Sequence, residues 1–245
     1  MEQKMIYRLA SLLYKFSFPV YKILYNRFKL RQDAHEVSLL RETIRNGDVV
    51  LDIGSNIGFY AKIISELVGD KGKLHCFEPD KTNFRHLQNL LEGKSSVVLN
   101  NKAASDQTGS IEIFTSHRLN VDHRTYKPEK YDSSYFIEAV AIDDYLGNSN
   151  HVDFIKMDIQ GSEFVALKGM RKTLTENKAL KVLIELWPHG LESAGTSAIE
   201  LLTFMKSNGY SAYMIHEKDL RELTLDNLVS LGNTENDFYN VIFKR

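Results

Sequence analysis

The sequence predicts an α/β domain with a mostly parallel sheet. Three short apolar stretches of the 245-residue chain each end in an acidic residue, and each is followed by a turn and then by a helical pattern. Strand, turn and helix repeated in this order are typical of a doubly wound, Rossmann-like sheet, in which the carboxyl ends of the strands line the ligand crevice. We therefore expect three acids at one cleft: Asp52 after residues 49–51, Glu78 after residues 73–77, and Asp158 after residues 152–157.

The composition is that of an ordinary globular protein, with 43% apolar and 26% charged residues. The net charge of −1 gives no reason to expect nucleic acid as a partner. Cys76 is the one cysteine, which excludes a disulfide within the chain, and the eight histidines form no ligand pair beside carboxylates, so we expect no metal. No apolar run could span a bilayer, and Lys15 and Lys22 interrupt any signal peptide, so we expect a cytoplasmic protein.

Residues 1–31 differ from the rest, and we expect a helical extension there, followed by the α/β domain in residues 32–245. The extension holds seven Lys and Arg residues against Glu2, a net charge of +6 that leaves −7 for the rest. Apolar and aromatic residues at helical spacing lie between the charges on both sides of Pro19. Two interpretations remain open: helices packed on the core with a solvated basic edge, or a basic segment in peripheral contact with an anionic membrane.

The turn after the first acid contains Gly54 and Gly58 and leads into a helix. These glycines allow the backbone to approach a ligand closely, and the helix start offers free N–H groups. A dinucleotide fingerprint would have a glycine where Asn56 stands, which disfavours a pyrophosphate. An acid followed by Gly-x-x-x-Gly instead resembles the first-strand pattern of S-adenosylmethionine-dependent methyltransferases.

The second acid has the position of a ribose ligand. Glu78 lies 24 residues after Gly54, near the spacing of about 20 at which such an acid accepts the hydroxyls of an adenosine. A third strand over residues 97–99 runs into Asn101 and Ala103. Polar and small side chains at this strand end suit the edge of an adenine ring.

Local signals place the remaining elements. Asp33 and Asp80 are expected to cap helices over residues 33–45 and 81–91, and a helix should run from Glu163 to about residue 177. Gly109 marks the turn before an added β-hairpin. The other expected elements are the hairpin strands at 110–115 and 135–141, strands at 179–184, 210–215 and 238–243, and helices at 142–146 and 197–208.

The segment between the hairpin strands is polar and irregular, which is typical of loops that carry function. Asp122, His123 and Arg124 bring together an orienting acid, a titratable base and a fixed cation. A plain surface loop is the alternative interpretation.

Taken together, the chain resembles the FkbM family of methyltransferases over roughly residues 33–190. The Lys-x-Asp-x-x-Gly-x-Glu element is the most family-specific part. Ser55 replaces the usual alanine, and Gln160 a common glutamate, which puts in doubt any role that needs a carboxylate there. The stretches that carry the resemblance are residues 51–58 (LDIGSNIG), 77–79 (FEP), 101–106 (NKAASD) with Gly109, 155–163 (IKMDIQGSE) and 184–185 (IE).

The resemblance implies a class I methyltransferase sheet of seven strands, the last of them antiparallel, with S-adenosyl-L-methionine as cofactor. It implies methylation of a hydroxyl oxygen, as in members that act on polyketides, sugars and glycolipids. The cofactor would be lined by Asp52, Gly54, Asn56, Gly58, Glu78, Asn101 and Ala103, and we add Ser55 and Tyr60 from the same turn and helix.

A hydroxyl is a poor nucleophile until its proton is leaving, so a base is expected. We take His123 as that base because its ordinary pKa suits neutral pH, with Asp158 as the competing candidate and Arg124 as a clamp for a substrate anion. Two other functions remain open. One is a nicotinamide-dependent oxidoreductase, which the missing glycine disfavours, and the other is a cofactor-binding module without catalytic activity.

Overall fold

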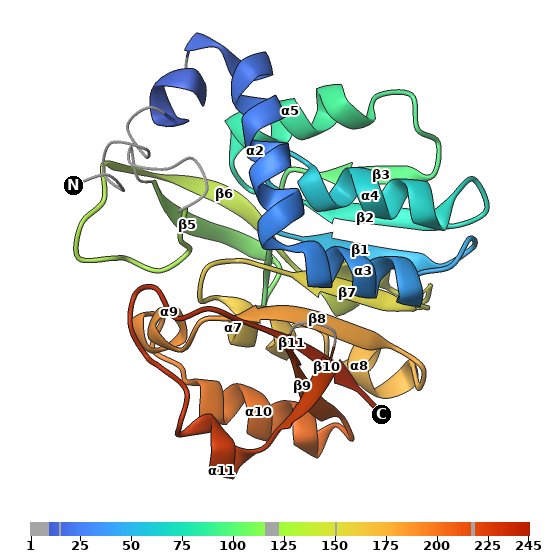
Figure 1. Ribbon diagram of the computed structural model, residues 1–245, viewed down its shortest axis with the longest axis vertical. Helices are drawn as coiled ribbons and strands as arrows, with labels where there is room; N and C mark the ends of the chain where they lie inside the picture. The colour runs from blue at the N-terminus through green and yellow to red at the C-terminus, as the bar shows by residue number, and fades with distance from the viewer. Residues whose placement is uncertain (1–9, 15, 116–122, 150, 217–218) are drawn as a thin grey trace.

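The computed structural model describes residues 10–14, 16–115, 123–149, 151–216 and 219–245, with helices on both faces of a central sheet (Figure 1). The helices are α2 (Phe18–Gln32), α3 (Ala34–Thr43), α4 (Phe59–Val68), α5 (Lys81–Leu91), α6 (Ile142–Leu146), α7 (Glu163–Lys168), α8 (Arg171–Glu176), α9 (Pro188–Ser193), α10 (Ala198–Ser207) and α11 (Leu225–Leu228). The strands are β1 (Val49–Ile53), β2 (Lys73–Phe77), β3 (Val97–Asn100), β4 (Ala103–Ser105), β5 (Gly109–Thr115), β6 (Ser133–Ala141), β7 (Phe154–Met157), β8 (Lys181–Leu186), β9 (Ser211–His216), β10 (Asp219–Leu223) and β11 (Tyr239–Lys244).

The main sheet has the strand order β10-β9-β11-β8-β7-β1-β2-β3. Strands β3, β2, β1, β7 and β8 pair in parallel, whereas β11 is antiparallel to both of its neighbours. The expected mostly parallel sheet with an antiparallel last strand is therefore confirmed. The edge strand β10 adds an eighth strand that we did not expect, because only Leu223 of its five residues is buried and the apolar alternation is missing.

Successive side chains of β1 point to opposite faces of the sheet, as in any strand. Leu51 and Ile53 pack in a core cluster with residues of α7, α8 and α10. Val50 packs in a second cluster with residues of α3, α4 and α5. Asp52 shares the face of Val50, so its carboxylate points toward the side of the sheet that α4 covers.

The added hairpin is part of a small second sheet, with the order β4-β6-β5. The β5–β6 pair matches the expected hairpin, and β4 pairs in parallel with β6 through Ala103 and Ala139. Ala103 thus begins a strand instead of simply following β3. This small sheet stands beside the carboxyl end of β2, where it closes one side of the site described below.

The single helix expected from Glu163 to about residue 177 is wrong. The structure has two short helices there, α7 and α8, which are separated at Gly169 and Met170. A side chain at Gly169 would meet the Ser105 carbonyl oxygen at 2.0 Å, so the backbone packs too closely there for another residue. The Asp143 carboxylate then accepts hydrogen bonds from the backbone N–H groups of Lys172 (2.8 Å) and Thr173 (2.9 Å) and so holds the first turn of α8.

The expected cap of the helix after Asp33 is also wrong. The Asp33 side chain makes no capping bond to α3, since it accepts a hydrogen bond from the Tyr60 hydroxyl at 2.6 Å and pairs with Lys29 of α2. Asp80 does cap α5, as expected, by accepting from the N–H groups of Thr82 and Asn83. Within the described ranges, no helix combines the length and the apolar character needed to cross a membrane.

Candidate active site

One cavity of about 250 Å³ lies at the carboxyl ends of β1, β2, β7 and β8. It is the crevice in which an α/β sheet binds ligands. Helix α2 forms one wall through Tyr25, Phe28, Lys29 and Gln32. Six of the predicted site residues line the cavity: Gly54, Asn56, Glu78, Ala103, His123 and Asp158.

The turn between β1 and α4 is held by hydrogen bonds within the chain. Ser55 donates from its hydroxyl to the Asp52 carbonyl oxygen at 2.8 Å, and is itself buried, so its side chain supports the turn. Asn56 has a left-handed backbone (φ 50°), and its side-chain oxygen accepts from the N–H of Ile57 at 2.7 Å. The cavity is therefore bordered by a turn of fixed shape.

The two glycines of this turn pack against protein atoms. At Gly54 (φ +84°) a Cβ would lie 1.9 Å from the Asp158 carbonyl oxygen, and at Gly58 (φ +93°) it would lie 2.7 Å from the Leu90 side chain. Gly54 thus brings the ends of β1 and β7 together, and Gly58 starts α4 beside α5. At both positions a side chain would clash with the chain itself. Gly54 also lines the cavity, so the expected close approach to a ligand there stays a prediction.

This packing predicts a large loss of stability for Gly54→Ala. The substitution combines an unfavourable φ with a clash against backbone, and we expect it to lower the free energy of unfolding by about 3 kcal/mol in urea titrations. Gly93→Ala is the matched control, because Gly93 has φ +80° but no atom within 4 Å of its would-be Cβ. It should cost only about 1 kcal/mol. If both variants lost the same free energy of unfolding, the close packing of Gly54 between β1 and β7 would not be the cause of the destabilisation.

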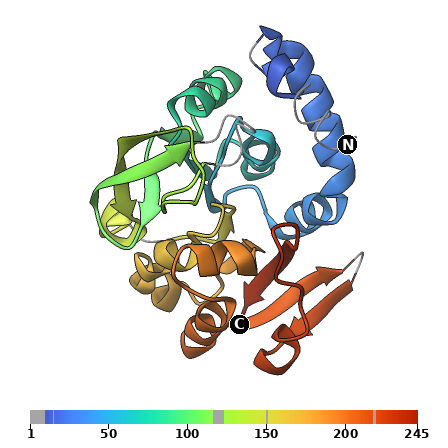
Figure 2. The ribbon, with the colours of Figure 1, turned by 90° about the vertical axis from the view of Figure 1, so that its left-hand side faces the viewer.

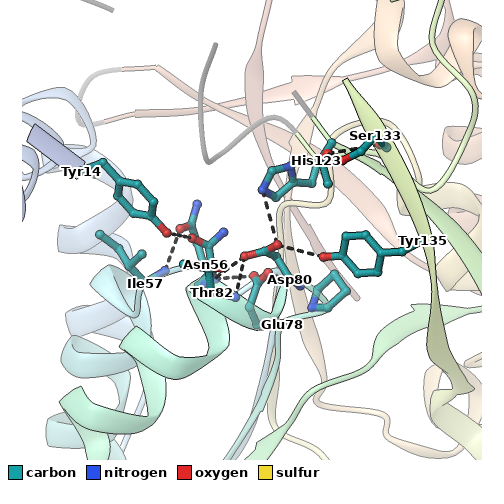
Figure 3. Close-up of polar contacts among 12 residues, drawn as sticks. Tyr14, Asn56, Ile57, Glu78, Asp80, Thr82, His123, Ser133 and Tyr135 are labelled. Carbon is teal, nitrogen blue, oxygen red and sulfur yellow. Dashed lines mark hydrogen bonds and ion pairs between the residues drawn. The ribbon is translucent and has the colours of Figure 1, made fainter. Parts of the chain in front are cut away.

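Glu78 is buried at one end of the cavity, and each of its carboxylate oxygens accepts one backbone hydrogen bond. Oε2 accepts from the N–H of Asn56 at 2.8 Å, and Oε1 from that of Asp80 at 2.9 Å (Figure 3). Burial raises the pKa of Glu78 to about 8, although the two N–H donors oppose that rise. Each oxygen keeps a lone pair that a ligand hydroxyl can use.

The other residues predicted at this end differ in their access to the cavity. Ala103 lines it together with the apolar side chains of Ala104 and Ile113. Asn101 lies outside the lining and donates from Nδ2 to the carbonyl oxygens of Glu78 (2.8 Å) and Pro79 (3.1 Å). Its side chain therefore holds the end of β2 in place and supports Glu78 indirectly.

Asp52 and Tyr60 lie behind the cavity wall. Asp52 is fully buried, and within the described residues neither carboxylate oxygen has a hydrogen-bond partner. Burial raises its pKa, which the ammonium of Lys156 partly offsets. Lys156 is itself buried, lies 4.6 Å from the ring centre of Tyr60, and has a raised pKa because Asp158 and Asp52 outweigh the effect of burial.

At the far end of the cavity from Glu78, Asp158 and Glu185 form a carboxyl pair. Gln160 bridges them by donating from Nε2 to Asp158 Oδ1 at 2.9 Å and to Glu185 Oε2 at 3.5 Å. Lys156 Nζ lies 3.5 Å from Asp158 Oδ2. A carboxylate in place of Gln160 would add another acidic group beside this pair and, when ionised, could donate a hydrogen bond to neither member.

The two carboxyl groups have opposite pKa shifts. Although burial raises it, the ammonium groups of Lys156 and Lys29 hold the pKa of Asp158 below its usual value. Burial and the neighbouring Asp158 charge raise the pKa of Glu185 well above its usual value. Asp158 is therefore the member of the pair that loses its proton first as the pH rises.

The loop that follows Asp158 is fixed by Glu163. Its Oε1 accepts from the N–H groups of Ile159 (2.9 Å) and Gly161 (3.3 Å), and burial raises its pKa to about 7. The carboxylate therefore ties the turn after β7 to the start of α7.

His123 lines the cavity at the Glu78 end. Its Nε2 lies 3.8 Å from Asp80 Oδ2, which also accepts from the Tyr135 hydroxyl at 2.9 Å (Figure 3). Arg124 lies outside the lining, with its guanidinium 4.9 Å from the Trp187 ring centre and 5.7 Å from that of Tyr126. Asp122 lies outside the described residues.

A family model described as the methyltransferase FkbM domain matches residues 52–212 of this chain. The chain belongs to the FkbM methyltransferase family. The cofactor of such a domain is S-adenosyl-L-methionine, in agreement with the resemblance noted above.

This FkbM chain is also similar to two curated relatives and, in fold, to one solved structure. The 2-O-methyltransferase NoeI of Sinorhizobium fredii is 28% identical over 147 residues, covering 53% of this chain and 60% of that protein. The hexuronic acid methyltransferase AglP of Haloferax volcanii is 29% identical over 149 residues, covering 59% of each. The chain thus spans about three fifths of the length of these relatives. A predicted rRNA methylase from Clostridium thermocellum has a TM-score of 0.52 at 11% identity, covering 86% of this chain and 93% of that chain, a likeness in fold alone.

The residues of this FkbM domain fit the cofactor. The buried Glu78 carboxylate keeps lone pairs for the two ribose hydroxyls, and the apolar surface around Ala103 and Ala104 suits an adenine ring. Gly54 continues the cavity wall toward Asp158, so an elongated molecule has room between the two acids.

Sequence reasoning missed part of the site, namely Lys156, Glu185 and the wall that α2 provides. Lys156 carried a usable signal, since a lysine inside an otherwise apolar strand, two residues before Asp158, must point to the same face as that acid. Glu185 was recognised as an acid near a strand end without a role. No local signal in residues 18–32 shows which helix face would meet the cavity.

Proposed function

We propose that this chain transfers the methyl group of S-adenosyl-L-methionine to a hydroxyl oxygen of a sugar or of a molecule that carries one. The observation that supports this most is the cavity itself, which joins a buried adenosine-type acid, Glu78, to a half-buried carboxyl pair, Asp158 and Glu185. The names of the relatives, a 2-O-methyltransferase and a hexuronic acid methyltransferase, favour a carbohydrate acceptor.

The bound cofactor would supply a methyl group made electrophilic by its positively charged sulfur. Glu78 would accept the ribose hydroxyls, while Gly54, Ser55, Asn56 and Gly58 keep the turn in shape beside it. Asp52, Tyr60 and Asn101 would act through their neighbours, since none of them lines the cavity. Much of the acceleration would come from holding the acceptor oxygen in line with the methyl carbon.

Asp158 is the proton acceptor that the arrangement favours. The ends of β2 and β7 lie on opposite sides of β1, so with the ribose at Glu78 the reacting end of the cofactor falls toward Asp158. Asp158 is ionised at neutral pH and can take the hydroxyl proton as the new carbon–oxygen bond forms. His123 lies at the Glu78 end beside Asp80. The anion clamp at Arg124 stays a prediction, since its guanidinium lies over the Trp187 ring and outside the cavity lining.

The test is a methyl-transfer assay with labelled S-adenosyl-L-methionine and acceptors that contain a hexose or a hexuronic acid. We expect the labelled product to survive mild alkali, because an ether is stable where a methyl ester is hydrolysed. An alkali-labile product would identify a carboxyl group as the acceptor. Tight binding of NAD in place of the methyl donor would overturn the proposal.

A further inference from the structure

Helix α2 is attached to the domain by one face only. Tyr21 is buried, and Tyr25 meets the Phe59 ring edge-on with a centroid distance of 6.4 Å. Phe18 stacks on the His86 ring of α5 at a centroid distance of 3.4 Å and an interplanar angle of 7°. These contacts fix the rotation of the helix about its own axis, so its opposite face has a defined direction.

The opposite face of α2 is apolar and exposed. Large apolar side chains of a folded domain rarely gather in water without a partner. Figure 2 shows α2 at the edge of the molecule, where no helix or strand of the described ranges covers its outer side. Half of the exposed large apolar residues in the described part of the chain lie in residues 12–30: Leu12 (53%), Phe16 (82%), Val20 (46%), Ile23 (58%), Leu24 (51%), Phe28 (62%) and Leu30 (46%).

The charges of this face have a single sign. Residues 10–32 contain five Lys and Arg residues and no Asp or Glu, in a chain whose net charge is −1. Arg27 and Arg31 are exposed, and their spacing of four residues places them together on the side of the helix that carries Val20, Ile23 and Leu24. An apolar stripe with arginines and no acids complements a surface that is apolar below and negatively charged above, which describes an anionic bilayer.

The same helix borders the active-site cavity. Phe28 is exposed on the outer face and also lines the cavity, together with the adjacent Lys29 and, one turn further on, Gln32. A bilayer that contacts the outer face of α2 would therefore lie at the mouth of the cavity.

We propose that α2 is a peripheral membrane-binding surface, whose outer face enters an anionic bilayer interface and brings the cavity mouth to the lipid headgroups. Val20, Ile23, Leu24 and Leu30 provide the apolar contact, and Arg27 and Arg31 pair with lipid phosphates. The consequence for the acceptor rests on the proposed function: a hydroxyl carried by a membrane lipid would reach Asp158 past Phe28.

The experiment is co-sedimentation of the full chain with phosphatidylglycerol–phosphatidylcholine vesicles and with pure phosphatidylcholine vesicles. We expect at least tenfold stronger partitioning into the anionic vesicles, weakened by salt. Arg27→Gln with Arg31→Gln should lower it about fivefold for each arginine. The triple variant Val20→Ser, Ile23→Ser, Leu24→Ser should lower it at least tenfold on both vesicle types. The matched control Ile199→Ser with Val229→Ser replaces exposed apolar residues elsewhere and should leave partitioning unchanged.

Two results would overturn the inference. One is the absence of binding to either vesicle type. The other is a dimer in sedimentation velocity that the triple variant abolishes, which would make a second copy of the chain the partner of this face. Binding of S-adenosylhomocysteine, measured on every variant, shows that the domain is folded. If the wild-type protein did not bind S-adenosylhomocysteine, the proposed function would be overturned. The vesicle result would then still decide the membrane-binding inference by itself.

Discussion

Glu78→Ala should weaken the binding of S-adenosylhomocysteine by about 100-fold. The substitution removes the acceptor of two ribose hydroxyls and also releases the N–H groups of Asn56 and Asp80, which shape the cavity end. Each hydrogen bond to a charged group contributes about 1.5–3 kcal/mol, so the estimate is conservative. Calorimetric titration is the measurement, and Glu66→Ala, an exposed acid on α4, is the control with unchanged affinity. If Glu78→Ala bound S-adenosylhomocysteine with unchanged affinity, the adenosine would not bind at this end of the cavity.

The raised pKa of Glu78 gives the same interaction a pH dependence. In the free protein the carboxyl group titrates at about 8, whereas the ribose hydroxyls need its ionised form. Binding below pH 8 therefore releases a proton, and affinity should rise with pH up to about 8 and then level off, with a limiting slope of about tenfold per unit. Glu78→Gln should bind weakly with no such slope. A flat profile in the wild type would show that the carboxyl group is already ionised at low pH.

Asp158→Asn should lower kcat about 1,000-fold and leave the dissociation constant of S-adenosylhomocysteine within threefold. A positioned general base contributes about 10²–10⁴-fold, and asparagine keeps the shape but cannot take the hydroxyl proton. Retained cofactor binding separates this effect from misfolding, which matters because Asp158 also balances the charge of the buried Lys156. Asp70→Asn, at an exposed turn, is the control with full activity.

His123→Ala decides between the two candidate bases. Because His123 lies beside Asp80 at the Glu78 end, we expect kcat to fall less than tenfold, with the larger change in the cofactor dissociation constant. If kcat fell 1,000-fold in His123→Ala and stayed near the wild-type value in Asp158→Asn, His123 would be the general base, as the sequence first indicated.

The sequence was most informative where chain order and function impose a pattern at close range. An apolar strand that ends in an acid, followed by a turn and a helix, can be recognised locally. Glu78 and Asp158 both line the cavity as this pattern indicated, whereas Asp52 lies behind its wall. Asp33 shows the limit of this reasoning. Its position before a helix predicted a cap, but Tyr60, 27 residues away, provides a hydrogen bond that no local pattern can foresee. The break at Gly169 likewise depends on Ser105, a neighbour only in the folded chain.

The carboxyl pair shows why chemistry was harder to predict than fold. Asp158 and Glu185 were each recognisable as acids near strand ends, yet their coupling depends on β7 and β8 being neighbours and on Gln160 lying between them. Gln160 looked like a departure that weakened the family motif. In the folded chain its amide donates to both of the carboxyl groups that lie side by side there.

The wall that α2 gives to the cavity bears on how such enzymes diversify. The family match begins at residue 52, whereas Tyr25, Phe28, Lys29 and Gln32 contact the cavity from outside it. One wall of the cavity is thus encoded outside the segment that carries Glu78 and Asp158. Exchange of the leading helix would let a lineage reshape this wall while both acids are inherited unchanged.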